Sequence, residues 1–340
     1  MIYRSKAPLR IGLAGGGTDV SPYCDLYGGA ILNATISLYA YATIELLQEP
    51  VVILEAIDRN ERVQYDMADN LPIDGKLDLA TGVYNRIVRD YGKIPSGFKL
   101  TTFVDAPAGS GLGTSSTLMV AILGAFAEWL RLPLGEYDIA HLSYNIERVE
   151  LAMAGGKQDQ YAATFGGVNF MEFYGQDNVI VNPLRIKPQY LYELENNLLL
   201  YFTATSRLSS TIIEAQSKNV TDKNQQSIEA MHHLKEQAQM MKEALLKGKV
   251  HEIGSILDYG FRYKKQTAQG ISSSRMDDIY EAALKAGATG GKISGAGGGG
   301  FMTFYCPGNT RYSVQDALSG FGGDFRSYQF TDRGLSTWSI

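Results

Sequence analysis

The residues that first suggest chemistry are three glycines in front of an apolar segment. The stretch 105–116 reads DAPAGSGLGTSS, and TLMVAILGAFAEWL follows it directly. A glycine-rich loop lets a ligand approach backbone N–H groups closely, because no Cβ intervenes. The first turn of a helix adds N–H groups without partners and partial positive charge. Together these features predict an anion site, and phosphate is the anion we expect. An ordinary glycine turn with a Ser/Thr cap is the alternative for this stretch alone.

The loop departs from two familiar phosphate-binding motifs. It has no lysine where the P-loop pattern GxxxxGK[ST] requires one. The dinucleotide pattern GxGxxG is nearly matched at 15–17 and at 109–113, but a proline-containing segment follows the first and a proline precedes the second. A dinucleotide-dependent dehydrogenase is therefore a less favoured alternative. The residues to which we assign phosphate binding are Pro107, Gly109, Ser110, Gly111, Leu112, Gly113, Thr114, Ser115 and Ser116.

Two more stretches, APLRIGLAGGGTD at 7–19 and KISGAGGGGF at 292–301, complete the pattern. In this order and at these distances, the three stretches resemble the motifs of the GHMP kinases, the superfamily of galactokinase, homoserine kinase, mevalonate kinase and phosphomevalonate kinase. The resemblance implies a two-domain α+β fold with ATP bound between the domains. The N-terminal domain, 1–185, would be ribosomal-S5-like, and the C-terminal domain, 186–340, would be ferredoxin-like.

The same resemblance implies roles for two acidic residues. The segment NIERVELAMAGGKQDQYAATFGG resembles the one that supplies a magnesium-binding glutamate and a catalytic aspartate, which match Glu147 and Asp159. Ser115 would be the hydroxyl ligand of Mg²⁺, with Ser116 as the alternative; this ion takes few protein oxygens and completes its shell with phosphate and water. Asp159 would accept the proton of the attacking hydroxyl, and the positive charge of Arg10 would stabilise its carboxylate.

The first motif also indicates the acceptor. Galactokinases carry Glu-His before Thr-Asp there and fucokinase-like enzymes carry Gly-Gly-Trp, whereas this chain carries three glycines. RIGLAGGGTDVSPY and FTATSRLSSTIIEAQ closely resemble bacterial heptose 7-phosphate kinases, which phosphorylate the anomeric hydroxyl of a sugar that already bears a phosphate. The residues that we expect to bind the acceptor are Gly16, Gly17, Thr18, Asp19, Arg207, Ser209 and Gly297.

The phosphate of such an acceptor needs a cationic anchor. Arg207 precedes an expected helix whose first turn contains Ser209 and Ser210. A guanidinium beside a helix N-terminus suits a phosphate dianion. A well-capped helix with a surface arginine explains the same residues without a ligand. Lys157 and Lys292 are further cationic candidates, each expected to be solvated or to face ATP.

Three functions fit these residues. The first is an ATP-dependent heptose 7-phosphate 1-kinase, whose 1,7-bisphosphate would lead to nucleotide-activated heptose for surface polysaccharides. The second is a kinase for another sugar, such as fucose. The third is a sugar sensor without turnover on the same scaffold. The set of Arg10, Glu147 and Asp159 argues against the third, because a sensor has no need of a base.

Composition limits the partners. The chain has 340 residues, a formal net charge of -5 and two cysteines far apart in sequence. This charge argues against nucleic acid, and two distant cysteines make no disulfide framework. The N-terminus lacks the apolar region of a signal peptide, and the run 118–130 is too short to span a bilayer. We expect a cytoplasmic protein that binds a sugar phosphate and ATP but no membrane, with a homodimer as the assembly to test.

The elements that must position these residues follow from patterning. β-branched and aromatic runs predict strands in the first 60 residues and at 98–106, with a helix between them. That helix is expected at 79–91. The remaining expected elements are a helical stretch at 135–154, a helix at 222–246, a hairpin formed by 166–175 and 178–184, strands at 196–205 and 301–306, and a last hairpin within 327–340.

Overall fold

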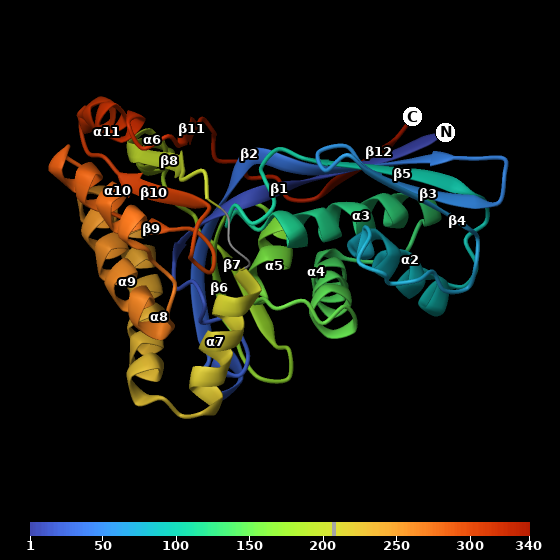
Figure 1. The fold of residues 1–340 in the computed structure, drawn as a ribbon, viewed down its shortest axis with the longest axis horizontal. Helices are drawn as coiled ribbons and strands as arrows, with labels where there is room; N and C mark the ends of the chain where they lie inside the picture. Colours follow the sequence, from blue (N-terminus) through green and yellow to red (C-terminus); the bar gives the residue numbers. More distant parts are fainter. Residues whose placement is uncertain (206–208) are drawn as a thin grey trace.

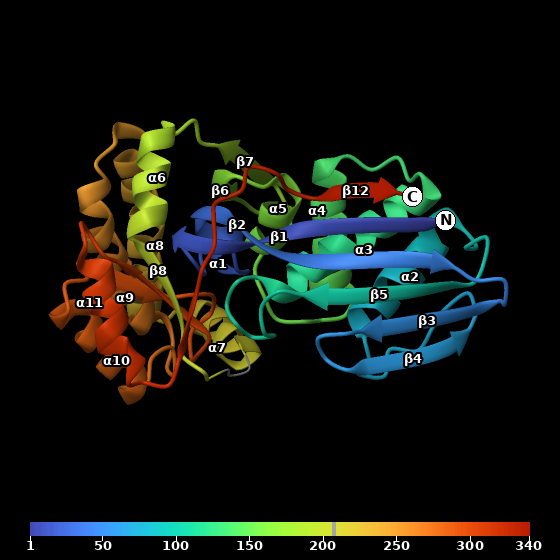
Figure 2. The ribbon, with the colours of Figure 1, turned by 90° about the horizontal axis from the view of Figure 1, so that it is seen from above.

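Two β-sheets, each covered by helices, form the computed structural model, which describes residues 1–205 and 209–340 (Figure 1). Within this part of the chain the first sheet has eight strands in the order β12-β1-β2-β5-β3-β4, with β6 and β7 continuing from β2 (Figure 2). Its strands are β1 (Ile2–Ala14), β2 (Gly29–Leu46), β3 (Val51–Ala56), β4 (Glu61–Asp66), β5 (Phe98–Val104), β6 (Val168–Phe173), β7 (Val179–Pro183) and β12 (Ser336–Ser339). β3 and β5 pair in parallel, and the other pairs are antiparallel.

Strand β2 joins the two parts of the first sheet. It is 18 residues long and pairs with β1 on one side. On its other side, Ala40–Leu46 pair with β5 and Gly29–Ala34 pair with β6. The first half of β2 is buried throughout, while burial alternates with exposure in the second half. Alternation is expected where helices cover only one face of a sheet.

We call the first sheet with its helices the first lobe, and the second sheet with its helices the second lobe. Helix α3 lies at the centre of the first lobe. It packs on β1 and β2, with α2, α4 and α5 on the same side of the sheet (Figure 1). Its sequence is apolar on nearly every side, and most of it is buried. Such a helix needs partners all round. The helices of this lobe are α1 (Tyr23–Tyr27), α2 (Asp78–Tyr91), α3 (Thr114–Leu130), α4 (Glu136–Tyr144), the π-helix η1 (Asn145–Glu150) and α5 (Gln158–Phe165).

The second sheet is antiparallel, with the order β11-β8-β10-β9. Helix α9 packs on β9, and α8 packs on α9 and reaches β2 of the first sheet. The strands are β8 (Leu198–Phe202), β9 (Gly290–Ile293), β10 (Phe301–Tyr305) and β11 (Asp324–Arg326). The helices are α6 (Pro188–Asn197), α7 (Ser209–Thr221), α8 (Gln225–Lys247), the 3₁₀ turn η2 (Val250–Glu252), α9 (Ile253–Thr267), α10 (Ser274–Lys285) and α11 (Thr310–Ser319).

Most expected elements are confirmed, one boundary is displaced, and one expectation is wrong. The helical stretch expected at 135–154 is present as α4 followed directly by the π-helix η1, but it ends four residues early, at Glu150. The expected last hairpin does not form: β12 pairs with β1, so the two ends of the chain lie side by side (Figure 1). An extended segment can pair with a distant strand edge as readily as with its neighbour, and local patterning does not distinguish them. The division of the chain into two domains at residue 185 stays a prediction. Strand β12 follows that position in the sequence but belongs to the first sheet.

No helix in the described part of the chain is long and apolar enough to cross a membrane.

Candidate active site

The glycine-rich loop leads directly into α3 and packs against the third motif. Gly111 has a φ of 82°, and a Cβ at this position would lie 2.5 Å from the carbonyl oxygen of Ser294. A Cβ on Gly300 would lie 2.4 Å from the carbonyl oxygen of Ser110, and the Phe301 N–H donates to that same oxygen at 2.9 Å. The two glycine motifs therefore form one backbone-packed unit, and the lack of side chains is needed for this contact as well as for ligand approach.

A cavity of about 420 Å³ lies over this unit. The predicted residues that line it are Arg10, Gly17, Asp19, Gly109, Gly111, Gly113, Thr114, Ser115, Ser116, Asp159 and Gly297. Its lining does not include Pro107, Ser110, Leu112, Gly16, Thr18 or Glu147. Ser110 and Leu112 are fully buried, and their carbonyl oxygens already accept from the Phe301 and Arg10 N–H groups, so neither residue presents a group to the cavity. Arg207 and the side chain of Ser209 lie outside the described residues.

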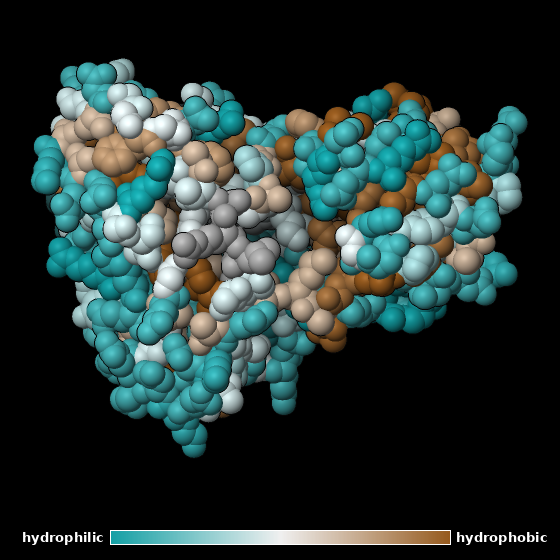
Figure 3. Space-filling model, viewed as in Figure 1, coloured by the Kyte–Doolittle hydropathy of each residue, from teal (hydrophilic) through white to brown (hydrophobic). Residues whose placement is uncertain are grey.

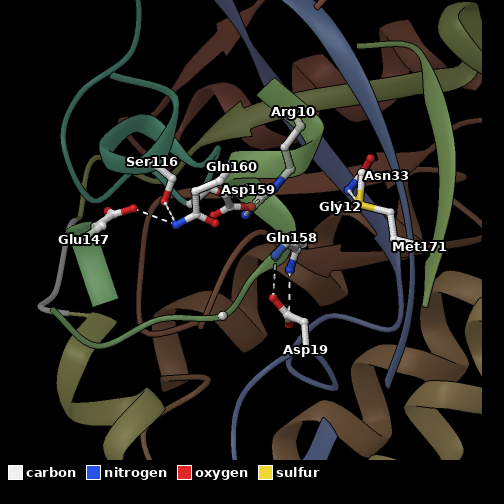
Figure 4. Close-up of polar contacts among 12 residues, drawn as sticks. Arg10, Gly12, Asp19, Asn33, Ser116, Glu147, Gln158, Asp159, Gln160 and Met171 are labelled. Atoms are coloured by element: carbon white, nitrogen blue, oxygen red, sulfur yellow. Dashed lines mark hydrogen bonds and ion pairs between the residues drawn. The ribbon is translucent and has the colours of Figure 1, made fainter. Parts of the chain in front are cut away.

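Arg10 and Asp159 form a partly buried ion pair beside the loop (Figure 4). Arg10 Nε and Nη2 each lie 2.6 Å from Asp159 Oδ1, and Nη1 donates to the carbonyl oxygen of Gly111 at 2.6 Å. The Arg10 side chain is 4% exposed and the Asp159 side chain is 18% exposed. A Cβ on Gly113 would lie 3.1 Å from Asp159 Cγ, so the carboxylate borders the glycine-rich loop. Its place in the first turn of α5 also favours negative charge.

Glu147 lies on η1 and is fully buried, and its carboxylate is hydrogen-bonded to the first turn of α3. Ser115 Oγ donates to Glu147 Oε1 at 2.7 Å. Gln160 Nε2 donates to Glu147 Oε2 at 2.7 Å (Figure 4). The Ser116 hydroxyl oxygen accepts from both Gln160 and Arg148, at 3.1 and 2.9 Å. Both serines line the cavity, but Ser115 is exposed and bonded to a carboxylate, whereas Ser116 is 1% exposed and its oxygen accepts two hydrogen bonds.

Arg148 shapes the loop between η1 and α5, a role that sequence reasoning missed. Its guanidinium donates to the carbonyl oxygens of Ala154 at 3.1 Å, Met153 at 3.4 Å and Gly156 at 3.4 Å. A Cβ on Gly155 would lie 2.1 Å from Arg148 Cζ, so the loop wraps tightly around the side chain. The adjacent Gly155–Gly156 pair is the sequence signal that could have indicated such an approach.

Asp19 marks the other end of the cavity. It is 2% exposed, and its carboxylate accepts from the Gln158 backbone N–H at 3.0 Å and from Gln158 Nε2 at 3.5 Å (Figure 4). Burial raises the pKa of Asp19, and the nearby Asp159 adds to that shift, while the Gln158 N–H opposes it. Thr18 contributes differently from our expectation, since its hydroxyl donates to the carbonyl oxygens of Gly15 and Ala30 and is buried. Thr18 fixes the turn that carries Asp19.

The lysines near the site differ in their partners and in whether they line the cavity. Lys157 is buried, pairs with Asp177 at 2.9 Å, and is absent from the cavity lining, so it is neither solvated nor directed at the cavity. Lys292 Nζ donates to the carbonyl oxygen of Gly12 at 2.7 Å. Lys264, which sequence reasoning missed, lines the cavity and donates to the carbonyl oxygen of Gly16 at 3.0 Å. Because the approach of α9 to the first motif is tertiary, no local signal marks Lys264.

A second, more apolar cavity of about 310 Å³ adjoins the first at Gly109, Thr114, Ser115 and Met153. Its walls include Leu54, Leu77, Leu100, Leu118 and Ile122. Hydrophobic residues are visible on this face of the first lobe, whereas the lower face of the second lobe is mainly hydrophilic (Figure 3). An apolar cavity therefore lies next to the glycine-rich loop.

Fold and site together define a kinase scaffold, and the chain belongs to the GHMP kinase family. The model of the GHMP kinases N terminal domain matches residues 78–167, and that of the GHMP kinases C terminal domain matches 241–324. The two-domain fold expected from the motifs is therefore confirmed.

Particular relatives are similar along the whole chain. The D-glycero-alpha-D-manno-heptose 7-phosphate kinase of Campylobacter jejuni is 48% identical over 99% of both chains. The crystal structure of a D-glycero-D-manno-heptose 1-phosphate kinase from Bacteriodes thetaiotaomicron is 48% identical, with a TM-score of 0.85 and 99% of each chain covered. A Lactococcus lactis galactokinase structure shares the fold at 17% identity, with a TM-score of 0.80 over 98% of this chain and 95% of its own.

Proposed function

We propose that this GHMP kinase transfers the γ-phosphate of ATP to the anomeric hydroxyl of D-glycero-D-manno-heptose 7-phosphate, giving the 1,7-bisphosphate. The position of Asp159 carries the proposal: Arg10 holds its carboxylate against the phosphate loop, in the cavity that also contains Asp19. Full-length similarity to two proteins named as heptose phosphate kinases supports the choice of sugar.

The transfer would use the free oxygen of Asp159. Arg10 occupies Oδ1 with two nitrogens, which leaves Oδ2 to accept the proton of the anomeric hydroxyl. As that O–H bond breaks, the sugar oxygen bonds to the γ-phosphorus, and the bond from the γ-phosphorus to the bridging oxygen of ADP breaks. A positioned base contributes roughly 10²- to 10⁴-fold to such a step. The Arg10 guanidinium keeps the carboxylate oriented and offsets its charge.

Mg²⁺ would be held by Ser115 and Glu147. The Ser115 hydroxyl lines the cavity and is hydrogen-bonded to a buried carboxylate, which is a donor set of hard oxygens. Such a pair fits an ion that takes few protein ligands and completes its shell with phosphate oxygens and water. When bound, the ion would neutralise phosphate charge during transfer. The apolar second cavity would take the adenine of ATP.

A coupled ADP-release assay across sugars and sugar phosphates tests the proposal. We expect turnover with D-glycero-D-manno-heptose 7-phosphate, and ³¹P NMR of the product should show phosphate at both the first and the seventh carbon. Running the heptose 1-phosphate beside it separates the activities named for the two relatives. Turnover with fucose alone favours the fucokinase-like alternative, and binding of a sugar without ADP release favours a sensor. Location in the cytoplasm and assembly as a homodimer stay predictions, to be tested by cell fractionation and light scattering.

A further inference from the structure

Lys264 carries a buried ammonium at the acceptor end of the cavity. The residue lies on α9 of the second lobe, is 6% exposed, and lines the cavity near Gly17, Asp19 and Gln216. An ammonium has three N–H donors. Within the described residues, this one has a hydrogen bond to the carbonyl oxygen of Gly16 and no carboxylate oxygen within 4.0 Å. Burying a cation with so few partners is unfavourable unless a ligand supplies more.

The other cations that line the cavity are already occupied. Across the described lining residues these are Arg10 and Arg148. Arg10 is bound to Asp159 and to the carbonyl oxygen of Gly111. Arg148 donates to three carbonyl oxygens and lies 3.4 Å from the carboxylate of Glu147. Lys264 is therefore the cation with donors left for a ligand in this part of the cavity.

Asp19 determines which chemistry these donors suit. Burial lowers the pKa of Lys264 to about 8, and the negative charge of Asp19 opposes that shift, so the two groups act on each other across the cavity. This part of the cavity thus presents a positively charged hydrogen-bond donor, Lys264, and a negatively charged hydrogen-bond acceptor, Asp19. A phosphate dianion placed there would be repelled by the Asp19 carboxylate. Two adjacent hydroxyls match the pair, because one can accept from the ammonium while the other donates to the carboxylate.

We propose that Lys264 is a specificity-determining residue that donates to one hydroxyl oxygen of the acceptor sugar while Asp19 accepts from a neighbouring hydroxyl. This inference rests on the proposed function of the same cavity. A sugar that lacks or inverts this hydroxyl leaves the buried ammonium without its partner, which makes rejection strong. Because Lys264 comes from the second lobe and Asp19 from the first, acceptor recognition requires both lobes in their observed arrangement.

Substitution of Lys264 by methionine tests the proposal, with Lys265→Met as the matched control. Lys265 is the next residue on α9, is partly exposed, and pairs with Asp277 at 3.4 Å. We expect Lys264→Met to lower kcat/KM for the acceptor roughly 10- to 100-fold, the range for a hydrogen bond to a charged group. The KM for ATP should stay unchanged, and Lys265→Met should behave as the parent protein.

Monodeoxy analogues of the acceptor distinguish recognition from a structural role. The parent should lose about 10- to 100-fold on the analogue that lacks the contacted hydroxyl. Lys264→Met should then handle that analogue as well as the complete sugar. If Lys264→Met shows the same further loss of kcat/KM on every deoxy analogue, Lys264 has only the structural role of holding the Gly16 carbonyl. If its loss of kcat/KM is confined to phosphorylated sugars, Lys264 binds the phosphate. Each of these results overturns the proposal.

Calorimetric titration of D-glycero-D-manno-heptose 7-phosphate without ATP separates this inference from the proposed function. Binding that weakens in Lys264→Met supports the recognition role even if the parent shows no turnover. Absence of binding to the parent overturns both proposals. Lys264→Gln, which keeps a donor without the charge, replaces the methionine variant if that variant lacks a cooperative thermal transition.

Discussion

The replacement of Asp159 by asparagine is the sharpest test of the transfer chemistry, because the structure assigns different partners to the two carboxylate oxygens. Oδ1 receives two nitrogens of Arg10 at 2.6 Å, and Oδ2 borders Gly113 of the phosphate loop. In the variant, the amide oxygen must face the guanidinium, because two sets of donors repel each other. The amide NH₂ then takes the place of Oδ2, where a proton acceptor is needed.

The expected loss follows from that exchange of groups. A missing general base lowers kcat by roughly 10²- to 10⁴-fold. The phosphate loop and the Ser115–Glu147 pair are untouched, so affinity for ATP should remain within about twofold of the parent. The Arg10 guanidinium also loses an anionic partner while 4% exposed, so we expect the unfolding free energy to fall by roughly 1–3 kcal/mol.

Single-turnover quench-flow with the acceptor in excess measures the chemical step directly, and fluorescence titration with an ATP analogue measures nucleotide affinity. Asp278→Asn, an exposed position on α10, serves as the matched control. If Asp159→Asn keeps more than a tenth of the parent rate, transfer occurs without this base and the assignment is wrong. A parallel loss of ATP affinity would instead show that the ion pair maintains the phosphate loop.

Four further predictions can be measured with standard assays. Ser115→Ala should raise the Mg²⁺ concentration for half-maximal rate several-fold, and an unchanged requirement would exclude Ser115 as a ligand. Gly111→Val should destabilise the protein by more than about 3 kcal/mol in thermal melts, since its φ of 82° and the carbonyl oxygen of Ser294 both oppose a side chain. Arg207→Ala should lower acceptor kcat/KM by roughly 10- to 100-fold for the phosphorylated sugar alone, and an equal loss for an unphosphorylated sugar would refute the anchor. Burial and neighbouring cations lower the pKa of Lys292 to about 7 from 10.5, so the unfolded chain binds more protons between these values. Unfolding free energy should therefore rise from pH 7 to 10 more steeply in the parent than in Lys292→Met, which urea melts will measure.

The sequence by itself determined the features whose cause is local. Glycines before an apolar run predicted a glycine loop that leads directly into a helix, which is confirmed at the start of α3, while its binding of phosphate stays a prediction. The runs 166–175 and 178–184 predicted the β6–β7 hairpin, and the three motifs indicated the GHMP kinase fold. Ser115 was preferred to Ser116 as the Mg²⁺ ligand only through the family resemblance, since both are small hydroxyl residues in the same turn, and that assignment stays a prediction.

The tertiary structure alone decided how distant residues share one cavity. The family resemblance had already related Arg10 to Asp159, 149 positions away, but nothing in the sequence indicated that the carbonyl oxygen of Gly16 accepts from the ammonium of Lys264 across 248 positions. The same applies to β12, whose partner is the first strand of the chain. Such contacts depend on how whole elements pack, because the free energy of burial is gained over complete faces of helices and sheets. A local sequence pattern indicates only that a helix or strand has an apolar face. Which residues of other elements contact that face depends on tertiary packing.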